Sequence, residues 1–183
     1  MVVNICLINM YKNIETDFSK LFPKGVDLTI YKVSEPVLLE KLKMFDGIII
    51  SGSNRRIHSD KSRHHLPKEL LDLGIPVLGI CYGFQWMTHV LGGVVATFPD
   101  KKERIYNKFI TIKEPFSVSR HKYKFNHHDY IATIPPGFTE VLSHGEEIWV
   151  AYDKEKRYLG VQFHPEKYVA TGKDFFMKWV LCF

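Results

Sequence analysis

The first half of the chain alternates between two hydrophobic patterns, and this alternation restricts the possible folds more than any other feature. Short apolar runs of strand length are each followed by a segment with apolar residues at helical spacing. The strand-like runs are Val2–Met10, Asp27–Val33, Phe45–Ile50 and Pro76–Ile80, and the helical segments are Ile14–Leu21, Pro36–Met44, Leu66–Leu73 and Phe84–Leu91. Alternating strands and helices joined by short connections predict an α/β fold, with a mostly parallel central sheet and helices on both of its faces.

The pattern changes after Gly93, where strand-like pieces follow one another without helical segments between them. Turns such as Pro135–Phe138 and Ser143–Gly145 separate the pieces, and we expect smaller antiparallel strands here. The pieces are Val94–Phe98, Lys108–Ile112, Lys122–Phe125, Ile148–Tyr152 and Tyr158–Phe163, and an amphipathic helix over Gly172–Leu181 follows them. The 183 residues contain no repeat and no linker, so the sequence predicts a single domain over residues 1–183.

Composition and charge exclude several classes of protein. Hydrophobic residues make up 45% of the chain, which excludes intrinsic disorder, and no apolar run approaches the roughly 20 residues of a membrane span. The N-terminus has no secretory signal, and the three cysteines show no zinc-site spacing. We therefore expect a cytoplasmic protein with reduced thiols, which uses neither a metal nor a cofactor and binds neither a membrane nor nucleic acid.

The stretch Gly79–Gln85 (Gly-Ile-Cys-Tyr-Gly-Phe-Gln) places a cysteine where a predicted strand ends and a predicted helix begins. A tight turn at such a junction lifts the side chain of Cys81 out at the carboxyl end of the sheet, an arrangement called a nucleophile elbow. Glycines at 79 and 83 remove side chains where strand and helix crowd together. The N-terminal end of the helix favours a thiolate at Cys81 and supplies backbone N–H groups, notably that of Tyr82, for an oxyanion. We favour a catalytic cysteine over a buried structural one.

A cysteine nucleophile needs a base, and the base needs a group that orients it. Among the nine histidines, His164 stands out, because a predicted strand delivers it to a turn in the stretch Gly160–Glu166 (Gly-Val-Gln-Phe-His-Pro-Glu). Pro165 fixes the backbone just beyond it, and Glu166 can accept the second imidazole N–H. His-Pro-Glu alone is compatible with an ordinary turn. Together with the elbow, it predicts a Cys81, His164 and Glu166 triad.

These two stretches resemble the active-site motifs of class I (triad) glutamine amidotransferase domains, and the resemblance extends along essentially the whole chain. It is closest to the glutaminase subunit of the GMP synthetase type. Ser51–Ser53 occupies the place of the glycine-rich oxyanion loop of that family, and Asn126–Asp129 resembles its His-Gly-Asp segment, which contacts glutamine. Pro135–Phe138 and Phe175–Trp179 also look like that branch.

The resemblance implies an enzyme that hydrolyses the side-chain amide of glutamine to glutamate and ammonia. Cys81 would attack the amide carbon and form a glutamyl thioester. His164 would protonate the departing ammonia and then activate water, with Glu166 holding its tautomer. In this family the ammonia passes to a synthetase domain or subunit, and the similar branch points to purine biosynthesis.

The resemblance also assigns binding residues. The oxyanion would be held by backbone N–H groups of Tyr82 and of the Gly52-Ser53 loop, and substrate binding falls to Gln85, Asn126, His127, His128 and Asp129. Two positions depart from the family pattern. Ser53 stands where the family usually has a second glycine, and a serine resists a positive φ that glycine would allow. His128 stands where the related segment has glycine, so its side chain should lie near the glutamine pocket.

Three functions remain open at this stage. An ammonia-supplying glutaminase subunit leads, followed by a free-standing hydrolase of γ-glutamyl peptides or amines with the same triad. A weakly active relative with a regulatory or binding role is third. Because 183 residues hold one glutaminase site, we expect no fused synthetase domain, and ammonia would leave to a separate synthetase subunit or to solvent.

Basic residues gather in one segment, Arg55–His65, although the net charge of +5 is modest. A solvated loop is the simpler interpretation of this segment. Because the segment directly follows the predicted oxyanion loop, the alternative is that it lies on the rim of the active site, where a partner protein would dock.

Overall fold

A nine-stranded sheet runs through the part of the chain that the computed structural model describes, namely residues 2–11, 17–32, 39–58 and 66–182. Five neighbouring strands in it are parallel: β2 (Val26–Lys32), β1 (Val3–Asn9), β3 (Gly47–Ile50), β4 (Val77–Ile80) and β11 (Tyr158–Val161). Antiparallel neighbours extend the sheet beyond β11, in the order β10 (Glu147–Asp153), β8 (Asp129–Thr133) and β5 (Val94–Thr97), while β9 (Thr139–His144) pairs with β10. The expected parallel centre with antiparallel strands from the second half is confirmed.

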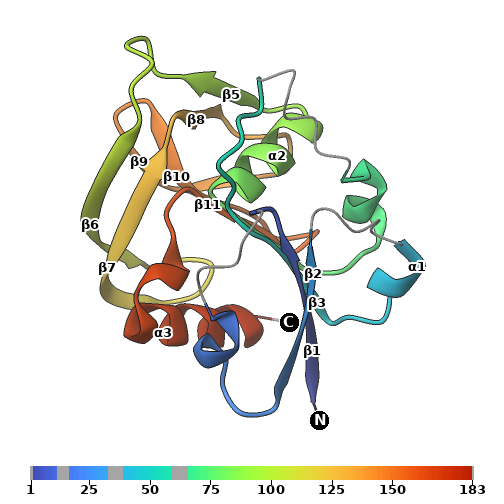
Figure 1. Ribbon diagram of the computed structural model, residues 1–183. Coiled ribbons are helices and arrows are strands. Elements are labelled where there is room, and N and C mark those ends of the chain that lie inside the picture. The colour runs from blue at the N-terminus through green and yellow to red at the C-terminus, as the bar shows by residue number, and fades with distance from the viewer. Residues whose placement is uncertain (1, 12–16, 33–38, 59–65, 183) are drawn as a thin grey trace.

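Two further strands form a hairpin outside this sheet, which Figure 1 shows as a long ribbon beside it. They are β6 (Arg104–Ile112) and β7 (Val118–His127), joined by an antiparallel ladder with one register shift between Ile110 and Ile112. A single bridge connects the hairpin to the chain beyond β11, because the backbone N–H of His164 donates to the carbonyl of Lys124 at 2.8 Å. The hairpin therefore lies against the segment that carries the candidate catalytic histidine.

Helices cover both faces of the sheet, as the alternating pattern predicts. Successive residues of β1 point to opposite faces, so that Ile5 and Leu7 join one apolar core while Cys6 and Ile8 join the other. The first core is closed by α3 (Val169–Val180), the 3₁₀ helix η1 (Phe18–Leu21) and the hairpin; the second is closed by α1 (Leu39–Leu42), the 3₁₀ helix η3 (Lys68–Asp72) and α2 (Tyr82–Val90). Figure 1 shows α3 on the opposite side of the central strands from α1.

Several predicted helices differ in kind or in extent from what the sequence indicates. The segment Leu66–Leu73 contains a 3₁₀ helix rather than an α-helix, and so does the described part of Ile14–Leu21. Residues 12–16 and 33–38 lie outside the described residues, so only Leu39–Leu42 of the predicted helix Pro36–Met44 is observed as helical. Both long helices start earlier than expected, at Tyr82 and Val169, and neither has a side-chain hydrogen bond at its N-cap. Without a capping side chain, nothing in the sequence marks these starting points.

Three strands of the second half, β6, β7 and β10, are longer than expected, and this half has more strands than the sequence indicates. Two of them, β8 and β9, were not expected as strands, and the expected turn Ser143–Gly145 is in fact the end of β9 followed by a turn at Gly145 with φ 61°. The strand expected over Tyr158–Phe163 ends at Val161. Beyond that point the chain turns toward the carboxyl ends of the parallel strands, where the candidate site lies.

Candidate active site

Cys81 lies at the junction between β4 and α2, in a backbone conformation that few residues other than glycine adopt. Its φ is 49° and its ψ is −102°. The conformation is held on both sides, because the N–H of Cys81 donates to the carbonyl of Val161 at 2.7 Å and its carbonyl accepts the N–H of Gln85 at 3.0 Å. A side chain at Gly83 would run into the carbonyl oxygen of Ile50, so only glycine fits where the helix crosses the strand. The predicted nucleophile elbow is therefore present, with strain stored at the cysteine.

His164 and Glu166 form a buried pair just beyond β11. The Nδ1–H of His164 donates to Oε1 of Glu166 at 2.8 Å, and both side chains are 2% exposed. Burial alone would lower the pKa of His164, but the Glu166 carboxylate outweighs it and raises that pKa, with Cys81 acting in the same direction. Burial alone would raise the pKa of Glu166, and His164 reverses this and lowers it. The pair is thus an imidazolium facing a carboxylate, and Cys81 interacts with the same ring.

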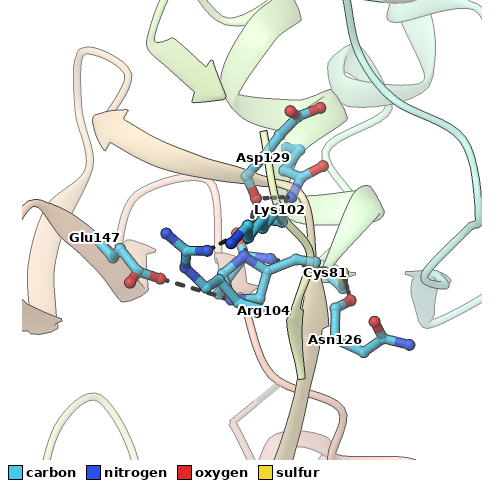
Figure 2. Close-up of polar contacts among 9 residues, drawn as sticks. Cys81, Lys102, Arg104, Asn126, Asp129 and Glu147 are labelled. Atoms are coloured by element: carbon cyan, nitrogen blue, oxygen red, sulfur yellow. Dashed lines mark hydrogen bonds and ion pairs between the residues drawn. The ribbon is translucent and has the colours of Figure 1, made fainter. Parts of the chain in front are cut away.

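The sulfur of Cys81 has two further polar neighbours. Its Sγ atom lies 3.6 Å from the backbone carbonyl oxygen of Asn126, a contact visible in Figure 2, and the side-chain amide of Gln162 donates to the sulfur at 3.6 Å. Gln162 is fully buried, and our sequence interpretation did not single it out. It stands two residues before His164 in the same stretch, so its position next to the predicted base was the signal that could have identified it.

A cavity of about 180 Å³ opens in front of Cys81. It is lined by residues from the segments named by the sequence interpretation and by others that it did not name: Tyr11, Ser53, Asn54, Arg55, Arg56, Cys81, Gln85, Glu103, Asn126, His127, His128 and Asp129. The structure therefore brings all five predicted substrate-binding residues to one cavity with the candidate nucleophile. Tyr11 and Glu103 are additions that come from loops distant in sequence from the predicted residues, whereas Asn54 directly follows the predicted Gly52-Ser53 loop.

The wall formed by Asn126–Asp129 is organised around one backbone carbonyl. The carbonyl of Asp129 accepts the side-chain amide of Gln85 at 2.7 Å and the Nδ1–H of His127 at 3.1 Å. The carboxylate of Asp129 accepts the hydroxyl of Thr97 at 2.6 Å. His128 points along the cavity, with its Nε2 3.7 Å from Oε1 of Glu103. The carbonyl of Asp129 thus fixes two side chains of this wall. Four other buried atoms of the wall have no hydrogen-bond partner among the described residues, namely Oδ1 of Asn126, Nε2 of His127, Nδ1 of His128 and Oδ2 of Asp129.

The loop after β3 lies on the other side of the cysteine. A Cβ atom added at Gly52 would stand 2.5 Å from the hydroxyl of Tyr11 and 2.8 Å from Cε1 of His164, so this backbone packs directly against the candidate catalytic histidine. Ser53 is not among the described residues with a positive φ, and the backbone conflict that a serine would meet there does not arise. Its hydroxyl donates to the carbonyl of Met10 at 3.1 Å and ties the loop to the end of β1.

Tyr82, the remaining candidate for the oxyanion site, is the first residue of α2. Its backbone N–H therefore lies in the first turn of the helix, whose N–H groups point out of the N-terminal end. The basic segment follows the Gly52-Ser53 loop, and Arg55 and Arg56 line the cavity. Residues 59–65 of that segment lie outside the described residues.

No group of histidine, cysteine, aspartate or glutamate side chains in the described part of the chain could hold a metal ion, and no described helix is long and apolar enough to cross a membrane.

Known proteins with similar sequences agree on one family. A family model described as glutamine amidotransferase class-I matches residues 6–181. The GMP synthase [glutamine-hydrolyzing] of Nostoc sp. is 40% identical over 134 residues, which make up 69% of this chain and 24% of that protein. The chain thus spans about a quarter of the length of the curated relatives it matches.

Two solved structures share the fold. A protein from Thermoplasma acidophilum described as a GMP synthase subunit superimposes with a TM-score of 0.76 at 21% identity, covering 100% of this chain and 94% of the other. A glutamine amidotransferase from Thermotoga maritima superimposes with a TM-score of 0.67 at 21% identity, covering 96% and 81%. At these identities the likeness concerns the fold, which confirms the α/β architecture expected from the sequence.

Proposed function

We propose, from the premise that this chain belongs to the class I glutamine amidotransferase family, that it hydrolyses the side-chain amide of glutamine to glutamate and ammonia through a thioester on Cys81. The observation that carries this proposal is the juxtaposition of the strained Cys81 elbow, which lines the cavity, with the buried His164–Glu166 pair behind it, whose histidine interacts with Cys81. A strained nucleophile beside an oriented base is the arrangement that amide hydrolysis by a cysteine requires.

In the first half of the reaction, the Cys81 thiolate attacks the amide carbon and a sulfur–carbon bond forms. The carbonyl oxygen becomes an oxyanion, which the backbone N–H groups of Tyr82 and the Gly52-Ser53 loop stabilise. His164, an imidazolium because Glu166 raises its pKa, donates a proton to the amide nitrogen. The carbon–nitrogen bond then breaks, ammonia leaves, and a γ-glutamyl thioester remains on Cys81.

In the second half, the neutral imidazole of His164 accepts a proton from a water molecule as that water attacks the thioester carbon. The oxyanion forms again in the same site, and the carbon–sulfur bond breaks to release glutamate and the thiolate. Glu166 accepts the Nδ1–H of His164 throughout, so the other ring nitrogen always faces the reaction. Gln85, Asn126, His127, His128 and Asp129 line the cavity that would receive glutamine.

The fate of the ammonia is part of the proposal. The 134 residues matched in the Nostoc relative named GMP synthase make up only 24% of that protein, and we propose that a separate synthetase subunit of the GMP synthetase kind receives the ammonia. A free-standing γ-glutamyl hydrolase would use the same triad on a different leaving group. A regulatory relative would bind its ligand in the cavity without hydrolysing it.

Labelling and substrate comparison together test the proposal. The purified chain should form one adduct at Cys81 with a glutamine-analogue electrophile, and Cys81→Ala should form none. The unlabelled protein should release ammonia from L-glutamine faster than it releases free amino acid from γ-glutamyl dipeptides. Faster turnover of dipeptides would favour the γ-glutamyl hydrolase, and labelling without turnover of either substrate would favour the regulatory relative.

A further inference from the structure

The positive charge of the chain is concentrated in the hairpin of β6 and β7. Residues 104–127 contain six lysines and arginines and a single acidic residue, Glu114, so this segment has a net charge of +5. The whole chain, with 25 basic and 20 acidic residues, also has a net charge of +5. The rest of the chain is therefore neutral overall, and the hairpin is the part that would attract an acidic partner.

One face of the hairpin points outward and exposes large apolar side chains. Ile105 and Phe109 share this face because they are four residues apart on β6, and they are 61% and 58% exposed. Tyr106 and the buried Phe125 pair on the opposite face, which packs into the core. The outer hairpin face consists of Ile105, Phe109 and the residues that alternate with, oppose or contact them, namely Asn107, Arg120, Lys122, Lys124 and Asn126.

Aromatic rings, rather than carboxylates, hold two of the cations on the outer hairpin face. The guanidinium of Arg120 lies 5.0 Å from the centre of the Phe109 ring, and Nζ of Lys122 lies 5.5 Å from that of Tyr168. The hydroxyl of Tyr168 donates to Oδ1 of Asn107 at 2.7 Å, across the same face. These contacts position the cations without neutralising their charge.

Strand β6 is also an edge strand. Among the described strands its only neighbour is β7. Exposed edge strands present unpaired backbone N–H and C=O groups, and apolar side chains on such an edge favour pairing with another chain. An uncovered strand of nine residues with two exposed apolar side chains is therefore suited to contact with a partner.

The outer hairpin face begins at the cavity in front of Cys81. Glu103, which precedes β6, and His128, which follows β7, both line this cavity. Asn126 belongs to both surfaces, because it lines the cavity and lies opposite Ile105 in the ladder. A molecule that covers the outer hairpin face would therefore lie next to the cavity of the candidate nucleophile.

Charge and shape indicate which kind of molecule binds there. A second copy of the chain is disfavoured, because two hairpins of net charge +5 would repel each other. Nucleic acid would match the charge, but Ile105 offers no ring for base stacking, and Arg120 covers one side of the Phe109 ring. An acidic protein surface with an apolar centre matches both the cations and the exposed apolar side chains.

We infer that the outer hairpin face is the docking surface of a protein that presents carboxylates around an apolar contact, and that this protein receives the ammonia. The identification of the partner as the ammonia acceptor rests on the proposed function. The docking surface itself rests on the charge, exposure and position of the hairpin. Arg120, Lys122 and Lys124 attract the carboxylates, and Ile105 and Phe109 supply the apolar contact.

Photo-crosslinking in the cells that produce the chain identifies the partner. The photoreactive residue p-benzoylphenylalanine replaces Ile105 or Phe109, and Met44, which is 77% exposed and follows α1, is the control position. Figure 1 shows α1 on the other side of the molecule from the hairpin. We expect both hairpin positions to link to the same protein, through peptides rich in aspartate and glutamate, and Met44 not to link to it. A link to a second copy, to nucleic acid or to nothing would overturn the inference.

The affinity of that purified protein for the chain tests the role of the cations. Arg120→Glu, Lys122→Glu should raise Kd at least about tenfold, because each reversed charge turns an attraction into a repulsion. The matched control Lys41→Glu, Lys43→Glu reverses two exposed charges on and beside α1 and should leave Kd unchanged. Kd of the unmodified chain should also rise at least about tenfold between about 0.05 M and about 0.5 M NaCl. Equal Kd values for the unmodified chain and Arg120→Glu, Lys122→Glu would contradict the inference.

Labelling at Cys81 separates the docking surface from the proposed function. Both double variants should label with the glutamine-analogue electrophile as fast as the unmodified chain, since none of the four substituted residues lines the cavity. With the partner and its substrates present, the amide nitrogen of ¹⁵N-glutamine should appear in the partner's product, about tenfold more slowly with Arg120→Glu, Lys122→Glu. Docking by a chain that does not hydrolyse glutamine would contradict only the proposed function. Hydrolysis without docking would contradict only the docking surface, and both without nitrogen transfer would overturn the identification of the partner as the acceptor.

Discussion

Nδ1 of His164 and Oε1 of Glu166 lie 2.8 Å apart, in side chains that are each 2% exposed. This contact fixes the tautomer of the histidine, since a carboxylate accepts the Nδ1–H and leaves Nε2 as the nitrogen for proton transfer. The backbone of Gly52 packs against the same ring, and the carbonyl of Lys124 accepts the backbone N–H of His164. The base is therefore positioned by three separate parts of the chain.

The ion pair between His164 and Glu166 should give the folded protein a stability that depends on pH in a defined window. The pKa of Glu166 is lowered in the fold, so its contribution is present above its ordinary value of 4.5 and is lost on acidification through the lowered pKa. The pKa of His164 is raised, so its contribution is complete below 6.5 and is lost as the pH rises through the raised pKa. Urea unfolding across the pH range compares the free energy of unfolding of the unmodified protein with that of the double variant His164→Gln, Glu166→Gln. The difference between the two should be largest between pH 4.5 and pH 6.5. A difference independent of pH would contradict the assignment.

Removing the charge of Glu166 should impair catalysis and change its pH dependence. Glu166→Gln should lower kcat by about 10²-fold, the lower end of what a positioned acid–base group contributes. Because the carboxylate no longer raises the pKa of His164, the alkaline limb of the profile of kcat/KM should move to lower pH. Steady-state kinetics with L-glutamine at several pH values measure both effects, and a fall in kcat with an unmoved alkaline limb would show that Glu166 does not set the pKa of His164.

The strained backbone at Cys81 should cost stability that glycine recovers. A Cβ atom at φ 49° and ψ −102° is strained, so Cys81→Gly should be more stable than Cys81→Ala by about 1 kcal/mol. Neither variant should hydrolyse glutamine. Urea unfolding of the two variants makes the comparison directly, since both lack the sulfur and differ only in one methyl group. An alanine variant as stable as the glycine variant would mean that the elbow is relaxed.

Close packing at Gly52 should make that position intolerant of a methyl group. Gly52→Ala places a Cβ atom 2.8 Å from Cε1 of His164 and 2.5 Å from the hydroxyl of Tyr11, so the ring or the loop must move. We expect kcat to fall at least about tenfold, the effect of misplacing a catalytic group by a fraction of an ångström. The combined change Gly52→Ala, Tyr11→Phe relieves only the contact with the hydroxyl and should remain impaired. Full recovery in the combined variant would assign the effect to Tyr11 instead.

The sequence was sufficient for the features that depend on short stretches of chain. Strands β1, β3 and β4 were predictable because continuous apolar runs mark strands buried on both faces, and β2 because its apolar residues alternate with polar ones. The Cys81 elbow was predictable because strand, turn and glycines are adjacent in sequence, and Glu166 because it is two residues from His164. These are local patterns with a direct physical cause.

Features that depend on packing between distant segments were not predictable in the same way. Helix α3 begins at Val169 without a capping side chain, and η3 is a 3₁₀ helix although its apolar spacing is helical. Glu147 lies on β10, 20 residues along the chain from the His127 that it faces, and no pattern around it indicates this contact. Tyr11 and Glu103 reach the cavity from loops whose placement only the folded chain determines.

The most direct test of the central claim is to observe the bond between Cys81 and the substrate. The purified protein is mixed with ¹³C-labelled L-glutamine, quenched in acid within one turnover and digested, and the peptide that contains Cys81 is weighed. We predict a labelled γ-glutamyl adduct on this peptide that hydroxylamine removes as the hydroxamate, with ammonia released in equal amount and neither product formed by Cys81→Ala. Release of ammonia from glutamine at an undiminished rate by Cys81→Ala would contradict the account.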